Sequence, residues 1–188
     1  TAQFPPMGQG DATTAKLQIR KLGLWKTIAT EDIESRSCTA LFRIENWDDT
    51  RDIPYRVTYD LRDASGKMKA HHWAGTVRRD PIDRELSVAG FTGNKYYLFP
   101  NTSLVENLSK QNPDVLFFSG DQIYEDHGGY GIIRTPSEPA ITNYLGKYIL
   151  FGWSFRDLLK DRPSLELPDD HDVYQGNLWG EGGIATNS

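Results

Sequence analysis

The sequence predicts an α/β domain that is preceded by a small antiparallel β-sandwich. Up to residue 79, apolar and polar residues alternate with the period of a β-strand. After Pro81, strand-like runs alternate with helical patterns, which is typical of a parallel sheet with helical crossovers. We therefore expect a leader or linker at 1–15, a sandwich of immunoglobulin or fibronectin type at 16–80, and an α/β domain at 81–188.

The N-terminal half contains the patterns of short antiparallel strands. Residues 1–15 are polar and rich in Pro and Gly, as in a linker. Strict alternation predicts strands at 40–45 and 55–62, and a further strand at 71–77. A turn sequence at 63–67 joins the last two strands into a hairpin. This spacing resembles a small antiparallel sandwich.

The C-terminal half contains three predicted strands and two predicted helices in alternation. They are the strands at 86–89, 115–119 and 165–167 and the helices at 101–110 and 144–160. Either Asn101 or Thr102 could cap the first helix, and Gly152 is expected to interrupt the second. This order predicts right-handed crossovers and a largely parallel sheet.

Bulk properties exclude several classes of protein. The 188 residues have a net charge of -5 and no basic run, which argues against a nucleic-acid partner. No segment approaches the roughly 20 apolar residues of a membrane helix. Cys38 is the one cysteine, so an internal disulfide is excluded. The chain begins at Thr1 and stops soon after its last acidic motif, and we expect it to be the N-terminal part of a longer protein.

The first candidate motif follows the strand predicted at 115–119. Gly120 allows a sharp turn, and Asp121 has two oxygens that can bridge two cations. Alone, a Gly-Asp pair is also typical of a turn or a helix cap. Tyr124 is either a phenolate ligand or a packed aromatic ring. Glu125 is expected to support a metal ligand without binding the metal itself. The adjacent Asp126 and His127 are interpreted as loop charges.

The second candidate motif, Asp169-Asp170-His171-Asp172, follows the strand predicted at 165–167. It places a carboxylate beside an imidazole, so that one group can bind a metal while the other protonates a leaving group or stabilises charge. A solvated acidic turn is the simpler alternative. Because the carboxyl ends of parallel strands meet at one sheet edge, the metal interpretation is favoured.

Two asparagines complete the set of candidates. Asn177 offers an amide oxygen that a hard cation would accept. Asn94 follows the first strand of the predicted sheet and could contact a phosphate or a metal, although a plain glycine-rich turn is the alternative. The sequence contains neither a phosphate-binding P-loop nor a serine nucleophile elbow, which weakens the nucleotide-triphosphatase and serine-hydrolase hypotheses.

Together, Ser-Gly-Asp121-Gln-Ile-Tyr124-Glu125 and Asp169-Asp170-His171-Asp172-Val resemble the alkaline phosphatase D (PhoD-like) metallophosphatases of the calcineurin-like superfamily. The resemblance spans residues 22–183. It implies a β-sandwich ahead of an α/β metallophosphatase domain, which is incomplete here. It also implies a secreted or periplasmic enzyme that hydrolyses small phosphomonoesters or phosphodiesters with two or more metal ions, such as iron and calcium.

By this resemblance, Asp121 corresponds to the metal-bridging carboxylate and Tyr124 to a phenolate ligand. Asp170 stands where the superfamily has an asparagine ligand. His171 matches the catalytic histidine, and a metal-bound hydroxide would attack phosphorus in line. Glu125, Asp169 and Asn177 would support these ligands.

The chain departs from the family pattern after its first predicted α/β strand. Family members have a Ser-Cys pair there, whereas Val88-Ala-Gly90-Phe91 has no thiol, so Asn94 is the candidate substitute. Further family ligands would lie beyond Ser188. The alternative functions are a degenerate, non-catalytic relative that serves binding or assembly, and a hydrolase of another ester.

Overall fold

The computed structural model describes residues 1–173 of the chain. The chain divides into two compact units, Thr1–Ile82 and Asp83–Ser188. In the described part of both units, no helix has the length and apolar character that crossing a membrane requires.

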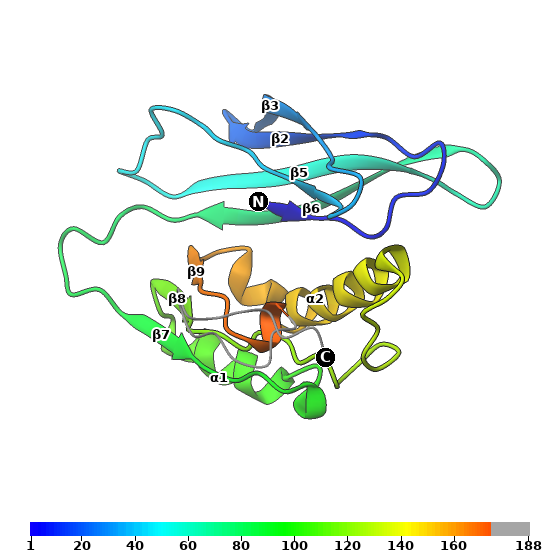
Figure 1. Ribbon diagram of the computed structural model, residues 1–188. Coiled ribbons are helices and arrows are strands. Elements are labelled where there is room, and N and C mark those ends of the chain that lie inside the picture. Colours follow the sequence, from blue (N-terminus) through cyan, green and yellow to red (C-terminus); the bar gives the residue numbers. More distant parts are fainter. Residues whose placement is uncertain (174–188) are drawn as a thin grey trace. The chain divides into compact units, whose positions relative to one another are not determined.

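The first unit is built on a four-stranded antiparallel sheet with the order β3-β2-β5-β6 (Figure 1). Its strands are β2 (Thr14–Lys21), β3 (Leu24–Asp32), β5 (Ile53–Arg62) and β6 (Met68–Val77). In the turn between β5 and β6, Asp63 accepts the backbone amides of Ser65 and Lys67. The strands predicted at 55–62 and 71–77 lie within β5 and β6, so these two predictions are confirmed.

A second, two-stranded sheet pairs β1 (Ala2–Gln3) with β4 (Thr39–Ala40). Its residues contribute to a core of Phe4, Ala15, Ile33, Cys38 and Ala40, against which Val57 and Tyr59 of β5 pack. The ring of Phe4 contacts that of Tyr59 edge to face at 4.9 Å. This short sheet does not establish a β-sandwich, and the immunoglobulin-like or fibronectin-like class stays a prediction.

Two expectations for this unit are wrong. Residues 1–15 do not form a separate linker, because Phe4 is only 3 % exposed, β1 is paired and β2 begins at Thr14. The strand predicted at 40–45 is limited to Thr39–Ala40. Leu41 is exposed and Phe42 packs on the core, so the alternation reflects side-chain burial without backbone pairing.

The second unit contains a parallel sheet of three strands in the order β7-β8-β9 (Figure 1). The strands are β7 (Val88–Phe91), β8 (Val115–Phe118) and β9 (Ser164–Glu166). The predicted parallel sheet is confirmed, although β7 and β9 are displaced by one or two residues from the predicted ranges. All three strands therefore end at the same edge of the sheet.

Two helices cover one face of this sheet. They are α1 (Thr102–Gln111), which joins β7 to β8, and α2 (Ser137–Leu159), which joins β8 to β9. Leu116 and Phe118 are alternate residues of β8 and so point to the same face. They pack in one core with Val105 of α1 and with Phe151, Phe155 and Leu158 of α2. Short 3-10 turns occur at Tyr96–Leu98 (η1) and His171–Val173 (η2).

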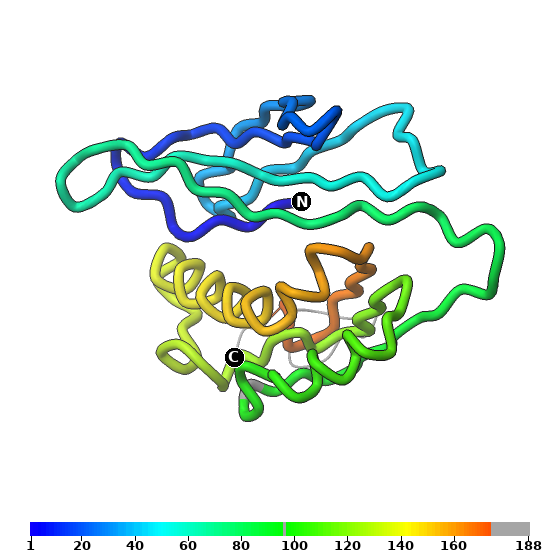
Figure 2. The backbone as a smooth tube through the Cα atoms, turned by 180° about the vertical axis from the view of Figure 1, so that it is seen from behind, coloured from blue at the N-terminus to red at the C-terminus, as the bar shows by residue number. Residues whose placement is uncertain are grey.

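The helix boundaries differ from the prediction. Figure 2 shows α2 as one continuous helix, which begins seven residues before the predicted start and continues through Gly152. A glycine inside a helix costs only about 0.5–1 kcal/mol, and the buried side chains of α2 outweigh that cost. Asn101 precedes α1 but adopts a left-handed conformation (φ 59°) and makes no side-chain cap. Its side chain bonds to Asn94 instead.

Candidate metal-binding site

Three predicted site residues meet at the carboxyl edge of the parallel sheet. Asp121 follows β8, and Asp170 and His171 follow β9. Each of them offers one ligand atom, and these atoms all lie within 4.8 Å of one another. Since carboxylate oxygens and an imidazole nitrogen are ordinary metal ligands, this group could hold a metal ion.

The turn that presents Asp121 depends on the glycine before it. Gly120 has φ 112° and Asp121 has φ 55°, so the chain bends sharply away from β8. A side-chain carbon at Gly120 would lie 2.5 Å from Cβ of Asp169. Only glycine fits here, both for its backbone conformation and for the close approach of the segment after β9.

The two oxygens of the Asp121 carboxylate have different surroundings. Oδ2 accepts a hydrogen bond from the Tyr124 hydroxyl at 2.8 Å. Oδ1 is buried and has no hydrogen-bond partner among the residues that the structure describes. Buried carboxylate oxygens are normally satisfied, because desolvation without a partner is costly. A cation between Asp121, Asp170 and His171 would supply the missing interaction.

The Tyr124 hydroxyl faces the predicted metal ligand. Burial, together with the hydrogen bond to Asp121 and the charge of that carboxylate, raises the pKa of Tyr124 to about 12. Its ring centroid lies 4.3 Å from that of His171. Without a cation the side chain therefore stays a phenol at neutral pH, and the phenolate role stays a prediction that requires a metal.

His171 is oriented by Glu125, for which the sequence predicts a role in supporting a ligand. Nδ1 of His171 lies 2.5 Å from Oε2 of the buried Glu125. Burial alone would lower the pKa of His171, but this hydrogen bond and the charges of Glu125, Asp121 and Asp170 outweigh it and raise that pKa. With Nδ1 donating to Glu125, Nε2 is the nitrogen available to a metal or to a reacting oxygen.

Asp172, the last residue of the second candidate motif, joins the segments that follow β8 and β9, a role that the sequence does not predict. Its side chain is fully buried. Oδ1 accepts the amide of Ile123 at 3.1 Å, and Oδ2 accepts the amide of Asp169 at 3.0 Å. Asp169, a predicted supporting residue, is exposed, and its Oδ1 accepts the amide of Asp170 at 2.9 Å.

Helix α2 fixes the loop that carries Glu125. Lys147 is 3 % exposed, and its Nζ donates to the carbonyls of Glu125 (2.8 Å), Gly128 (3.2 Å) and Gly131 (3.0 Å). One turn earlier, Asn143 donates to the Gly131 carbonyl at 2.7 Å. Burial lowers the pKa of Lys147. Lysine in the middle of an otherwise apolar helical stretch was the available sequence signal for this anchor.

The same helix also contacts the segment after β9. The Tyr144 hydroxyl donates to the backbone carbonyl of Asp172, and the Tyr148 hydroxyl lies 3.5 Å from Oδ1 of that residue. Neighbouring turns of α2 therefore hold both of the segments that provide ligands. A rigid element that supports a site in this way reduces the freedom of its ligands.

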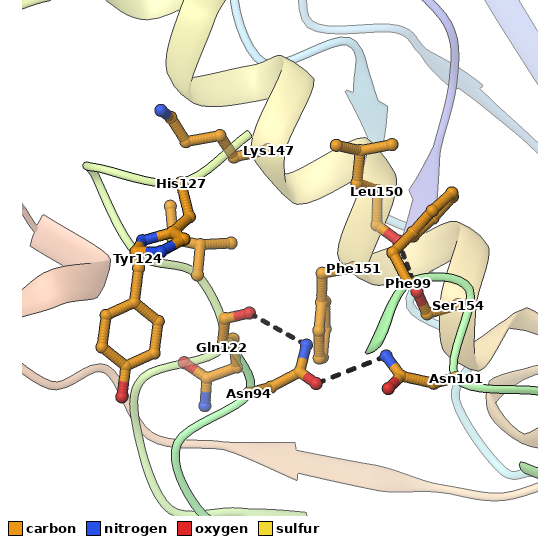
Figure 3. Close-up of a pocket in the computed structure, with 11 residues that line it drawn as sticks. Asn94, Phe99, Asn101, Gln122, Tyr124, His127, Lys147, Leu150, Phe151 and Ser154 are labelled. Atoms are coloured by element: carbon orange, nitrogen blue, oxygen red, sulfur yellow. Dashed lines mark hydrogen bonds between the residues drawn. The ribbon is translucent and has the colours of Figure 1, made fainter. Parts of the chain in front are cut away.

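Asn94 lies close to the site but directs its side chain elsewhere. Its backbone amide donates to the carbonyl of Asp121 at 2.8 Å. Figure 3 shows its side-chain amide between Gln122 and Asn101, with bonds of 3.5 and 3.4 Å along one wall of a pocket. The amide oxygen accepts from Asn101, so its predicted role as a metal ligand would require a reorientation. Asn177 lies outside the described residues.

The rim beside Tyr124 contains Asp126 and His127, which the sequence predicts to be loop charges. His127 Nδ1 lies 2.5 Å from Asp126, and its Nε2 lies 2.6 Å from the Tyr97 hydroxyl. The ring of His127 lies 6.4 Å from that of Tyr124 (Figure 3). These contacts hold the side chains of Asp126 and His127 beside the candidate ligand Tyr124.

A scan of protein-family models and a search of curated proteins gave no match to this chain. The resemblance to PhoD-like metallophosphatases therefore stays a prediction. The site itself is a group of two carboxylates and one imidazole that could hold a metal ion.

Proposed function

We propose that this chain carries the metal centre of a phosphoester hydrolase. The observation that supports this most directly is the buried Oδ1 of Asp121, which has no hydrogen-bond partner among the described residues. The carboxylate belongs to a group at the sheet edge in which ligand atoms of Asp121, Asp170 and His171 lie within 4.8 Å of one another. A structural carboxylate would be paired with a donor, whereas a metal ligand needs an open oxygen in the metal-free protein.

In this proposal, Asp121, Asp170 and Tyr124 hold the metal ions, of which there are two or more. The two oxygens of Asp121 suit a bridge between two cations. A phenolate is a hard, charged ligand that suits iron, and the carboxylates suit calcium. Bound cations would supply Lewis-acid charge to a phosphoryl group and would lower the pKa of water.

His171 is the proposed catalytic residue. Glu125 lies against its Nδ1, and the raised pKa of the imidazole favours the protonated form, in which Nε2 carries a proton. From that position His171 can stabilise negative charge on a phosphoryl oxygen or protonate the leaving alcohol. Glu125 balances the resulting imidazolium charge.

The test measures metal content and hydrolysis on the same samples. The purified chain is stripped with a chelator, reloaded with iron, calcium, manganese or zinc, and assayed with p-nitrophenyl phosphate and bis(p-nitrophenyl) phosphate. We expect metal-dependent turnover that Asp121→Ala abolishes along with metal retention. Glu106→Ala on the exposed surface of α1 is the matched control. Turnover that is equal in wild type and Asp121→Ala would refute the proposal.

A second candidate is a metal-binding module without turnover. The orientation of the Asn94 amide towards Asn101 favours it, because a substitute ligand for the first metal is then not in place. Metal retention that depends on Asp121, without hydrolysis of either ester, would support this candidate over the hydrolase.

A further inference from the structure

Lys95 places a cation on the rim of a site that consists mainly of carboxylates. Its Nζ lies 4.7 Å from the ring centroid of Tyr124, whose hydroxyl bonds to Asp121. Glu125 and Asp170 add further negative charge to the same site. A phosphoryl group that approaches these carboxylates needs positive charge from a metal, and Lys95 would add to it.

The backbone holds Lys95 in this position. The preceding residue, Asn94, donates its amide to the carbonyl of Asp121 at 2.8 Å, and the amide of Gly93 lies 3.4 Å from the carbonyl of Gly120. The segment that carries Lys95 is thus bonded to the turn that presents Asp121. The Lys95 side chain itself is exposed, so its flexible stem can move towards a ligand.

We propose that Lys95 binds a non-bridging oxygen of the substrate phosphoryl group, and that it favours phosphomonoester dianions over diester monoanions. This inference rests on the proposed hydrolase function. An ammonium group offers three donors and acts as a point charge towards phosphate. Since Coulomb attraction scales with charge, a terminal phosphoryl group of about -1.5 to -2 gains more from Lys95 than a singly charged diester does.

The alternative is that Lys95 makes only intramolecular contacts and does not bind the substrate. Its ammonium group lies against the Tyr124 ring, and its charge contributes to the lowered pKa of Asp126. In that case its replacement would leave the affinity for phosphate unchanged. Exposed charge contacts of this kind contribute little to stability, so Lys95→Met is expected to fold normally.

Inorganic phosphate binding tests the proposal without relying on turnover. The metal-loaded chain is titrated with inorganic phosphate by calorimetry as wild type, Lys95→Met, Lys95→Arg and Lys110→Met. Lys110 is an exposed lysine in the last turn of α1, close in sequence to the start of β8. It therefore lies towards the opposite sheet edge and matches the change in net charge.

We expect Lys95→Met to weaken phosphate binding by roughly 3- to 10-fold, as loss of one partly screened charge contact implies. Lys95→Arg should stay close to wild type, Lys110→Met should not change, and all variants should retain equal metal. In hydrolysis, KM should rise more for p-nitrophenyl phosphate than for its diester analogue.

Two results would overturn the inference: no phosphate binding by the metal-loaded wild type, or equal affinity in wild type and Lys95→Met. If turnover is intact while Lys95→Met binds phosphate normally, the hydrolase proposal stands and the Lys95 inference fails. If phosphate affinity depends on Lys95 but no ester is hydrolysed, the hydrolase proposal fails and the binding role of Lys95 stands.

Discussion

The buried carboxylate of Asp172 accepts the backbone amide of Ile123 at 3.1 Å, although 49 residues separate them in the sequence. This bond joins the segment after β8 to the segment after β9. The second oxygen of Asp172 accepts the amide of Asp169, which precedes the candidate ligand Asp170. The spacing between Asp121 and Asp170 therefore depends on a residue that need not contact a metal itself.

Replacement of Asp172 by Ala should destabilise the chain by about 2–4 kcal/mol, because the buried amide of Ile123 and the partly buried amide of Asp169 would lose their acceptor. Denaturant unfolding of the metal-free protein measures this loss. The affinity for metal should also fall, as Asp170 is no longer held relative to Asp121. The exposed Glu106→Ala change should stay within about 0.5 kcal/mol of wild type. Wild-type stability of Asp172→Ala would show that the bond to Ile123 is dispensable.

Two glycines should respond in opposite directions to substitution by alanine. Gly120→Ala combines φ 112° with a contact of 2.5 Å to Cβ of Asp169, so we expect a loss of about 1–3 kcal/mol. Gly152 lies inside α2, and an added side-chain carbon would meet no described atom within 4 Å other than its chain neighbours and the adjacent backbone of the helix. Gly152→Ala should stabilise the chain by about 0.5–1 kcal/mol. Thermal unfolding of both variants, measured side by side, checks the two signs.

Glu125→Gln should lower the pKa of His171 in the metal-free protein, since the carboxylate is what raises it against the opposing effect of burial. NMR titration of the imidazole measures the change directly. A histidine with a raised folded-state pKa adds stability that is fully present below its unfolded value of 6.5 and disappears as the pH rises through the folded value. The stability difference between wild type and Glu125→Gln should thus be larger at about pH 5.5 than at about pH 8. A difference that grows with pH would contradict this assignment.

Lys147→Met should loosen the loop at residues 125–131, because three backbone carbonyls lose their common donor. We expect a loss of about 1–3 kcal/mol in stability. Hydrogen exchange should also accelerate in that loop more than in the four-stranded sheet of the first unit. Lys110→Met is the control for the change in charge. Unchanged exchange in the loop would show that Asn143 and the local turns suffice to hold it.

The sequence predicted the parts of the fold and site that depend on regular local patterns. Alternation of strands and helices correctly implied a parallel sheet, and this topology brings Asp121 close to Asp170 and His171. Local composition gave the wrong prediction where tertiary contacts determine the structure of a segment. Phe4 turns a Pro- and Gly-rich segment into part of a core, and a continuous buried face carries α2 through Gly152.

The supporting roles of Asp172 and Lys147 could not be predicted, for a related reason. Asp172 looks like any member of an acidic run, and its burial follows from amides that are distant in sequence. Lys147 is one polar residue within a helix, and its three acceptors are carbonyls of a loop that has no regular pattern. Asn94 was correctly placed at the sheet edge, but only the packing of Asn101 determines where its amide points.

The division of the candidate ligands between two strands links cation binding to folding. Because Asp121 and Asp170 belong to segments far apart in the sequence, an unfolded chain cannot present them together to one ion. A cation that binds this group would therefore bind the folded state in preference to the unfolded state. At about 100 times its Kd, it would stabilise that state by about 2.7 kcal/mol. The melting temperature of the chain should thus rise with the free concentration of the metal ion that binds this group.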